Sequence, residues 1–501
     1  MKASYIFALL LTGYSIFAVF HARHRVIDGD EGYYASAARL VGEGKMPYVD
    51  FFYPQAPILP FVYGAWTQLN GYSLAWLRAL SAILTAGTLA LWGWFLLVVY
   101  GKVPWVAYAA FFAVLFSPFL LSWGVLIKTF ALGNFLATTM LICIWRASRS
   151  RNMKWMLLAG VSSGLLVSTR LLYAAVPVAV AIWIFFRVKA VSGLQPRSSL
   201  LSFAAGTAVA SIPALLLYIH DPDVFMFNNL GYHFLRSEPQ PLYLHMQHAA
   251  SFLGETVVAH PYMILVIILA LLGVYAATRS VLGKTVDPSA LNEVALVSTA
   301  GLLVVSLTPI PLYEQYFTGP LAPMLVPLVA AGIQVLWHMS RYLVYALALC
   351  VMPISYGEFH HEMTQASAMK GWQITAYDRV AQYIRNHTEP SDTVLSPWPG
   401  YACESGRNFL PGFENQFALP VSERLTDSQQ QHYHVGGKKA FIAAVREQIP
   451  KLIVIGAWVS PLFVTMNEGD KEQLYQALDQ QYRFASQIED VSVYERKPSG
   501  R

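Results

Sequence analysis

Three carboxylates stand within four residues near the start of the chain: Asp28, Asp30 and Glu31. They follow an apolar stretch of membrane-spanning length, so we expect them at the surface of a bilayer. Asp28 and Glu31 have the spacing of a helix capping box, and acidic side chains favour a helix N-terminus. Helix capping accounts for one or two of the three carboxylates. The alternative is chemical: one carboxylate acts as a general base on a hydroxyl while a second orients it.

Basic residues at the ends of apolar stretches form a second group. Arg23 and Arg25 directly follow the first stretch, where cationic side chains commonly extend to lipid headgroups. Lys128 and Arg170 differ, because each begins or breaks a helical pattern deep within apolar sequence. A cation in such a place either pairs within the protein or holds a lipid phosphate. The sequence leaves both readings open.

An aromatic, proline-rich segment at residues 309–317 precedes a late apolar stretch. Such a segment often serves only as an anchor at the membrane interface. This one also carries Glu314 and Gln315 between Tyr313 and Tyr316, which adds hydrogen-bonding groups on the side of the membrane expected for Asp30.

Histidines and cysteines show no metal-ligand or disulfide pattern. His245 and His248 are one helical turn apart but have no third ligand in register, and the other external histidines are scattered. Cys143 and Cys350 lie in apolar runs and Cys403 stands alone, so no disulfide framework follows.

Eleven apolar stretches must position these groups. A spanning helix needs about 20 apolar residues, fewer where neighbours bury it. The expected spans are residues 3–20, 75–99, 103–121, 129–145, 155–169, 171–187, 200–218, 261–278, 293–308, 320–338 and 341–356. The stretch 155–187 reads as two short helices broken near Arg170, or as one span with a re-entrant piece. The first stretch reads as an uncleaved anchor, because bulky residues precede any cleavage site.

Positive charge sets the orientation of the spans. If eleven spans alternate, the basic residues of the loops gather on one side, which is then the cytoplasm together with the N-terminus. These residues are Lys2, Lys102, the run 146–154, Arg187, Lys189, Arg197, Arg279, Lys284 and Arg341. The external parts are residues 21–73, 219–260, 309–319 and 357–501. The sequence therefore predicts a multi-pass inner-membrane protein whose C-terminal domain lies outside the cytoplasm, in a periplasm or extracellular space.

The first external loop, residues 21–73, and the tail, residues 357–501, have patterns of their own. Residues 33–44 have the spacing of a short amphipathic helix suited to the membrane surface, and a second interfacial helix is expected over about 56–69. Helical and strand patterns alternate along the tail, which predicts a small α/β domain. The expected elements are helices 374–386, 438–448 and 468–481 and strands 393–395, 452–455 and 491–495.

The composition agrees with this division. Of the 501 residues, 55% are hydrophobic and 13% charged, whereas soluble proteins carry about a quarter charged residues. Residues 356–501 hold 14 basic and 17 acidic residues, and residues 1–355 hold 20 and 12. This balance fits cationic cytoplasmic loops rather than nucleic-acid binding. We expect an α-helical polytopic membrane protein of about 11 transmembrane helices, residues 1–356, followed by a soluble α/β domain.

The first loop resembles that of a known family. It reads Asp28-Gly29-Asp30-Glu31-Gly32-Tyr33-Tyr34-Ala35 and later Pro47-Tyr48-Val49-Asp50-Phe51-Phe52-Tyr53-Pro54-Gln55-Ala56-Pro57. These runs are similar to bacterial membrane glycosyltransferases of the GT-C type, relatives of protein O-mannosyltransferases and lipid A aminoarabinose transferases. The segment 313–320 and the position of Arg170 are similar too. The resemblance covers most of residues 1–356, and the acidic loop is its specific part.

The resemblance implies glycosyl transfer outside the cytoplasm from a polyprenyl-phosphate-linked hexose or pentose to a lipid, glycan or protein acceptor. On this reading Asp30 is the base that activates the acceptor and Glu31 assists it. Residues implied in binding the donor and acceptor are Asp28, Tyr33, Tyr34, Tyr53, Gln55, Lys128, Arg170, Tyr313, Glu314, Gln315 and Tyr316. A leaving group that is already a phosphate also explains why no Gly-rich nucleotide-binding loop is found.

The chain departs from the family at one place. Many relatives carry another acidic residue near residues 122–128, where this chain has none. No cofactor is implied by the residues, and a divalent metal is left open. If the reaction needs a metal or a second acid, Glu314 or Asp50 is the substitute.

Two alternatives to an enzyme stay open. A transporter or flippase of a lipid-linked glycan should show charges in the middle of spans and paired repeats. Here the charges gather at span ends and no repeat is visible. A non-catalytic relative whose tail binds a partner is the third reading.

Overall fold

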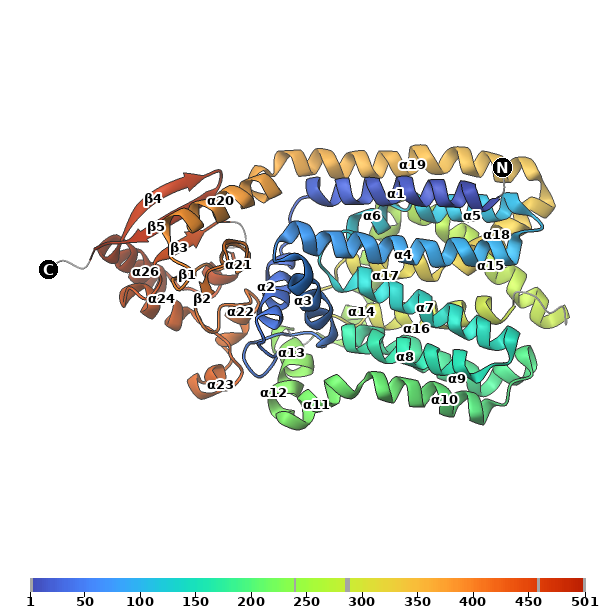
Figure 1. Ribbon diagram of the computed structural model, residues 1–501, viewed down its shortest axis with the longest axis horizontal. Coiled ribbons are helices and arrows are strands. Elements are labelled where there is room, and N and C mark those ends of the chain that lie inside the picture. Colours follow the sequence, from blue (N-terminus) through green and yellow to red (C-terminus); the bar gives the residue numbers. More distant parts are fainter. Residues whose placement is uncertain (1–2, 238–239, 284–288, 457–459, 499–501) are drawn as a thin grey trace. The chain divides into compact units, whose positions relative to one another are not determined.

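The computed structural model describes residues 3–237, 240–283, 289–456 and 460–498 (Figure 1). The chain forms two compact units. The first unit holds Met1–His21, Ser81–Ala214 and Pro239–Glu362, and the second holds Ala22–Leu80, Leu215–Glu238 and Met363–Arg501. Lys2 and Lys284, two of the basic residues used for orientation, lie outside the described residues.

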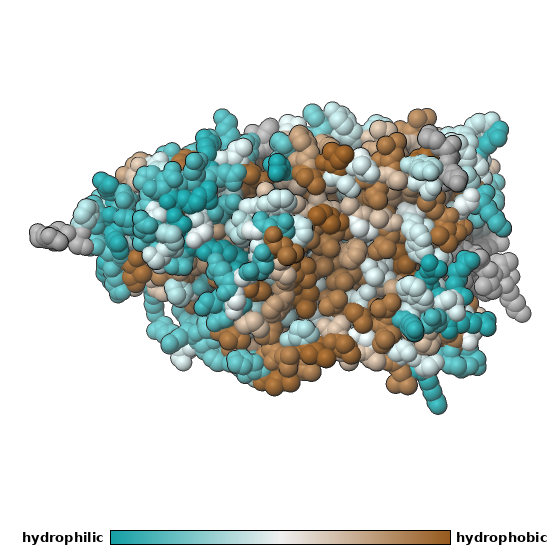
Figure 2. Space-filling view, viewed as in Figure 1, coloured by the Kyte–Doolittle hydropathy of each residue, from teal (hydrophilic) through white to brown (hydrophobic). Residues whose placement is uncertain are grey.

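Long apolar helices build the first unit. Six helical stretches of the described residues are long and apolar enough to cross a membrane singly. They lie in α1 (Ala3–His24), α4 (Leu74–Tyr100), α7 (Thr129–Ser150), η1 with α9 (Leu171–Ala174, Ala175–Ser192), α15 (Pro261–Gly283) and α19 (Arg341–Ala368). Hydrophobic side chains gather over the helices of this unit (Figure 2).

Three further helix pairs have the length and composition of one bent span each. The pairs are α5 with α6 (Pro104–Leu115, Pro118–Gly124) at 45°, α10 with α11 (Pro196–Ala210, Ile212–His220) at 53°, and α17 with α18 (Gln315–Met324, Val326–Met339) at 69°. Proline accounts for these bends, because it lacks an N–H group and its ring clashes with the preceding turn. Pro118 begins α6, and Pro320 and Pro323 lie inside α17.

Two shorter apolar helices, α8 (Met153–Thr169) and α16 (Ser289–Ser306), complete the set, with α14 (Leu242–Ala259) beside α15. Each of the eleven stretches expected from the sequence falls on one of these helices or pairs, so the multi-pass helical architecture is confirmed. The break near Arg170 is confirmed as well, because α8 ends at Thr169 and the backbone of Arg170 is extended.

Glycines bring α8 and α10 into close contact. A Cβ on Gly160 would lie 2.0 Å from the carbonyl oxygen of Phe203, and one on Gly206 would lie 2.2 Å from that of Leu157. Small residues are the usual means of helix association in membranes, because apolar side chains gain little by leaving lipid. Neither position can carry a side chain without separating the two helices.

The second unit joins segments that are far apart in sequence. The first loop supplies α2 (Glu31–Gly42) and α3 (Ile58–Asn70), and residues 215–238 supply α12 (Pro222–Met226), η2 (Phe227–Gly231) and α13 (Tyr232–Arg236). The tail helices are η3 (Lys370–Trp372), α20 (Ile374–His387), α21 (Gly400–Ser405), α22 (Ala418–Ser422), α23 (Asp427–His432), α24 (Lys438–Arg446), α25 (Ser460–Phe463) and α26 (Glu468–Gln481).

A five-stranded sheet forms the centre of the tail. Its strands are β1 (Thr393–Leu395), β2 (Asn408–Phe409), β3 (Leu452–Ile455), β4 (Tyr482–Ile488) and β5 (Val491–Arg496), in the order β2-β1-β3-β5-β4. β1 runs parallel to β2 and β3, whereas β5 is antiparallel to both β3 and β4. Phe441 of α24 and Leu474 of α26 pack with Ile453 of the sheet. The predicted combination of helices with a small sheet in the tail is therefore confirmed, with β2 and β4 added.

The helix α2 is not the half-exposed surface helix that its pattern suggested. Its residues Glu31 to Leu40 are all buried. The expectation was wrong because the two charged side chains in this stretch, Glu31 and Arg39, have partners inside the second unit. The second expected helix of the loop is α3, which begins and ends within two residues of the prediction.

Candidate functional site

The three carboxylates lie in the acidic turn, residues Asp28–Glu31, at the start of α2. The N–H of Asp30 donates to Asp28 Oδ1 at 2.9 Å, and the N–H of Asp28 donates to Glu31 Oε2 at 3.0 Å. The N–H of Glu31 donates to the backbone carbonyl oxygen of Asp28 at 2.9 Å. Asp28 therefore holds the turn that precedes the helix.

Glu31 is fully buried against Arg78 of α4. Arg78 Nε donates to Glu31 Oε1 at 2.8 Å, and a second guanidinium nitrogen donates to Oε2 at 2.5 Å. The remaining donors of the guanidinium reach the carbonyl oxygens of Ala22, Arg25 and Val26. All five N–H groups of Arg78 thus have acceptors. The pair connects the end of α1 with the start of α2, and sequence reasoning missed it because Arg78 looked like an ordinary residue at a span end.

Asp30 is half-buried, whereas both side chains of the Glu31–Arg78 pair are fully buried. The carbonyl oxygen of Gly29 accepts hydrogen bonds from two tail residues, Trp398 Nε1 at 3.0 Å and Gln416 Nε2 at 2.8 Å. Asp30 is therefore partly exposed, as Asp28 is, on a backbone that tail residues hold at Gly29. Its role as base, and the assisting role of Glu31, stay predictions.

Aromatic side chains named from the sequence gather beside the acidic turn. The rings of Tyr33 and Tyr34 lie 4.1 Å apart, and Tyr53 lies 6.3 Å and 6.4 Å from them. Burial raises the pKa of Tyr33 well above its usual range, and the nearby Tyr34 and Asp30 raise it further. Gln55 is half-buried and its N–H donates to the carbonyl oxygen of Tyr53. The structure thus brings the predicted loop residues together in the second unit.

Lys128 meets the late loop inside the first unit. Its Nζ donates to Gln315 Oε1 at 2.5 Å and lies 5.1 Å from the ring centroid of Trp123. The indole Nε1 of Trp123 donates in turn to Thr318 Oγ1 at 2.8 Å. Two stretches that are 187 residues apart therefore position one ammonium group.

Arg170 lies in the same unit at the break between α8 and η1. Its guanidinium lies 4.8 Å from the ring centroid of Tyr316 and 5.5 Å from that of Phe130. It also donates to Thr129 Oγ1 at 3.3 Å. Tyr316 follows Gln315 and Thr129 follows Lys128, so the two cations are held by adjacent residues of the same segments. The sequence named both cations, and the structure adds that their partners are neighbouring residues in the late loop.

Glu314 and Tyr313 complete the late loop. Tyr313 packs edge-on against Tyr316 at 5.6 Å. Glu314 Oε1 lies 3.2 Å from His260 Nε2, and Glu358 Oε2 lies 3.1 Å from the other ring nitrogen. Hydrogen bonds that the His260 ring donates to the Glu314 and Glu358 carboxylates raise its pKa to about 9, so the ring is charged at neutral pH. Sequence reasoning missed this contact, because no local pattern joins His260 to either acid.

An apolar cavity of about 320 Å³ lies beside this loop. Phe317 and Thr318, which follow Tyr316, form part of its wall. Most of the remaining wall comes from apolar side chains of α14, α15, α16 and α18, such as Val266, Leu296 and Leu328. A cavity of this kind accepts hydrocarbon and offers few hydrogen bonds.

Among the described residues, no three His, Cys, Asp or Glu side chains are grouped to hold a metal ion. Glu314 contacts His260, and the Asp50 carboxylate accepts from the N–H of Met46 at 2.7 Å. The two substitute acids named from the sequence thus contact a histidine ring and a backbone N–H, and the dependence on a metal stays a prediction.

No family model and no curated protein matches this chain in sequence. Its structure, in contrast, is similar to that of ArnT from Cupriavidus metallidurans bound to undecaprenyl phosphate. The TM-score is 0.66 at 12% identity, covering 97% of this chain and 97% of that chain. The chain has a GT-C fold.

The apo structure of the same ArnT gives a TM-score of 0.66 at 12% identity over 98% of both chains. The archaeal oligosaccharyltransferase AglB from Archaeoglobus fulgidus, in complex with an inhibitory peptide and a dolichol-phosphate, gives 0.49 at 14% identity. That match covers 99% of this chain and 74% of AglB. The GT-C fold and multi-pass membrane character expected from the sequence are confirmed.

Proposed function

We propose that this GT-C protein is a glycosyltransferase that moves a sugar from a polyprenyl-phosphate-linked donor to an acceptor hydroxyl outside the cytoplasm. The observation that carries the proposal is the placement of Lys128 and Arg170 next to a loop that also lines an apolar cavity. A polyprenyl chain needs an apolar cavity, and its phosphate needs cationic donors. The ArnT of the same fold holds undecaprenyl phosphate, which supports this class of donor.

Lys128 and Arg170 are proposed to hold the lipid phosphate. An ammonium has three N–H donors and a guanidinium five, and the contacts of Lys128 with Gln315 and of Arg170 with Thr129 are to neutral side chains. The rings of Trp123 and Tyr316 hold the cations without adding a competing negative charge. When the bond between sugar and phosphate breaks, negative charge grows on the phosphate, and cations fixed in a protein interior stabilise it.

Asp30 is proposed to take the proton of the acceptor hydroxyl. The hydroxyl oxygen then bonds to the anomeric carbon, and the carbon–oxygen bond to phosphate breaks with its electron pair left on the lipid phosphate. Attack from the face opposite the phosphate inverts the anomeric carbon. Glu31 supports this step by fixing the acidic turn through Arg78. The loop residues Tyr33, Tyr34, Tyr53 and Gln55 are proposed to contact the substrates, with the first loop and the tail in the periplasm or outside the cell.

An Asp30→Asn variant tests the proposal in proteoliposomes supplied with undecaprenyl-phosphate hexoses and pentoses labelled in the sugar. Because an amide cannot accept the proton, kcat should fall by about 10²–10⁴-fold. Asp50→Asn is the matched control, since Asp50 is also a loop carboxylate but bonds the backbone of Met46. Lys128→Met should raise the KM for the donor.

Two results would contradict the proposal. Undiminished transfer by a folded Asp30→Asn protein would remove Asp30 as the base. Movement of the labelled donor across the bilayer without a covalent product would favour the transporter or flippase instead.

A further inference from the structure

Tail residues hold the acidic turn at one peptide group, the one that joins Gly29 and Asp30. The carbonyl oxygen of Gly29 and the N–H of Asp30 belong to the same planar group. Trp398 and Gln416 donate to the oxygen, and the Asp28 carboxylate accepts from the N–H. A carbonyl oxygen has two lone pairs, so both tail donors bind it at once. The orientation of this plane is therefore fixed from both sides.

Burial makes these contacts costly to lose. Trp398 is 3% exposed and Gln416 1% exposed, so water is a poor substitute for either bond. The indole also occupies the space that a side chain at position 32 of α2 would need, because a Cβ on Gly32 would lie 2.3 Å from Trp398 Nε1. Tyr377 and Tyr401 contact the indole ring at 5.7 Å and 4.9 Å. Trp398 thus has little freedom to turn away from Gly29.

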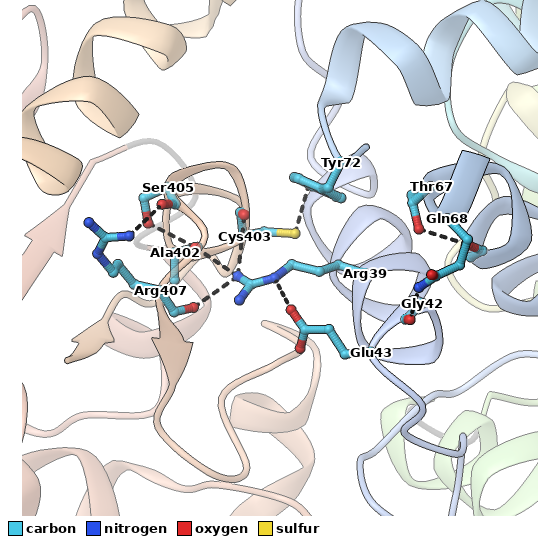
Figure 3. Close-up of polar contacts among 11 residues, drawn as sticks. Arg39, Gly42, Glu43, Thr67, Gln68, Tyr72, Ala402, Cys403, Ser405 and Arg407 are labelled. Carbon is cyan, nitrogen blue, oxygen red and sulfur yellow. Dashed lines mark hydrogen bonds and ion pairs between the residues drawn. The ribbon is translucent and has the colours of Figure 1, made fainter. Parts of the chain in front are cut away.

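A second set of contacts holds the other end of α2 (Figure 3). One guanidinium nitrogen of Arg39 donates to the carbonyl oxygens of Ala402, Cys403 and Arg407, at 3.2, 3.3 and 2.8 Å. Ala402 and Cys403 belong to α21, and the N–H of Gly406, which ends this helix, donates to the same two carbonyl oxygens. The side chain of Glu43 accepts from Arg39 Nε at 2.7 Å and holds the guanidinium in place. The tail therefore contacts α2 at both ends.

We propose that Trp398 and Gln416 are positioning residues for Asp30, and that the tail is part of the transfer site instead of a separate binding module. The inference rests on the proposed function. A general base must stay within hydrogen-bond reach of the proton it takes, and small misplacements reduce the rate strongly. If the Gly29–Asp30 peptide rotates, the Asp30 carboxylate moves with it. The loss should appear in kcat, because the donor phosphate is assigned to Lys128 and Arg170.

Three variants test this in the full-length protein: Trp398→Phe, Gln416→Met and the double variant. Phe keeps an aromatic ring and Met keeps the length of the side chain, but neither donates to Gly29. Gln430→Met is the matched control, because Gln430 Nε2 donates to the carbonyl oxygen of Ser422 at 2.8 Å and does not contact the acidic turn. The readouts are kcat, the donor KM and thermal stability, measured with the undecaprenyl-phosphate sugar that gives transfer.

Each single variant should lose about fivefold in kcat, the equivalent of one hydrogen bond of roughly 1 kcal/mol. The double variant should lose more than the product of the two, since the Gly29 oxygen then has neither donor. The donor KM should stay within about twofold, and Gln430→Met should keep full kcat even where the loss of its half-buried hydrogen bond lowers the stability.

Hydrogen exchange at residues 28–34 gives a readout that does not depend on transfer. Exchange there should accelerate in the double variant and stay unchanged in Gln430→Met. Transfer by the wild-type protein together with full kcat in the double variant, or with unchanged exchange, would overturn the inference and leave the proposed function standing. Absence of transfer by the wild-type protein would overturn the proposed function whatever the variants do.

Discussion

Replacing Arg78 alone should destabilise the protein more than replacing Arg78 and Glu31 together. In the native protein the two side chains are fully buried and joined by two hydrogen bonds. Arg78→Met leaves the Glu31 carboxylate buried without the cation that pairs with it. The double variant Glu31→Met, Arg78→Met leaves no charge there. Both variants lose the same three bonds to the carbonyl oxygens of residues 22, 25 and 26, so the stranded carboxylate is the difference between them.

The size of the effect follows from burial. Removing one partner of a buried ion pair costs about 3–5 kcal/mol, because the other charge stays desolvated. An unsatisfied buried group contributes about 1–3 kcal/mol of such a loss, and a charged group more. We therefore expect Arg78→Met to lose about 3–5 kcal/mol of unfolding free energy and the double variant to recover at least about 1–3 kcal/mol of it.

Denaturant unfolding in detergent micelles, followed by tryptophan fluorescence, measures these free energies. Arg379→Met is the matched control, because Arg379 pairs with Glu489 at 2.7 Å while 55% of its side chain is exposed, and such pairs contribute about 0–1 kcal/mol. If Arg78→Met costs no more than Arg379→Met, or if the double variant is the least stable of the set, the reasoning is wrong. Transfer by a folded double variant would also show that Glu31 acts through position alone.

Three further predictions concern the same two units. Gly32→Ala should destabilise the protein by about 1–3 kcal/mol, because the new Cβ would lie 2.3 Å from Trp398 Nε1; a melting temperature equal to that of the wild type would contradict this. The raised pKa of His260, about 9 against an ordinary 6.5, contributes stability that is complete below pH 6.5 and lost as the pH rises through about 9. His260→Gln should therefore flatten the fall of melting temperature over this window, and an unchanged slope would argue against the contact. Burial raises the pKa of Glu404 to about 7 from 4.5, so its stabilising effect is lost as the pH rises through about 7. Glu404→Gln should melt higher than the wild type at pH 8 but not at pH 4, since the amide oxygen still accepts from the N–H of Leu74; equal melting at pH 8 would refute the assignment.

Local patterns were sufficient for most of the helices. The eleven apolar stretches and the break at Arg170 follow from composition and spacing along the chain, because these patterns involve only residues that are close in sequence. The strand β4 escaped because it lies at the sheet edge with several exposed residues, so its side chains show no clear alternation. The burial of helix α2 was not predicted from the sequence, because an apolar helix face has the same residue pattern whether lipid or protein covers it.

The candidate site could likewise be predicted only in part from the sequence. Lys128, Arg170 and Gln315 could be named from chemistry, because cations and amides are rare in apolar sequence. Their mutual contacts could not, and neither could the pairing of Glu31 with Arg78, since these join residues 47 to 187 positions apart. Single-sequence reasoning reports which residues are unusual, whereas their partners depend on how the chain folds.

The contact between Gly29 and Trp398 also bears on how the protein is made. The two residues are 369 positions apart, and ribosomes add roughly 5–20 residues per second. The acidic turn therefore emerges roughly 20–70 s before the side chains that hold it exist. Helices built from local contacts form within that interval, but the Gly29–Asp30 peptide and the face of α2 that receives Trp398 must wait for the tail. The acidic turn is thus synthesised well before the tail residues that complete its native surroundings.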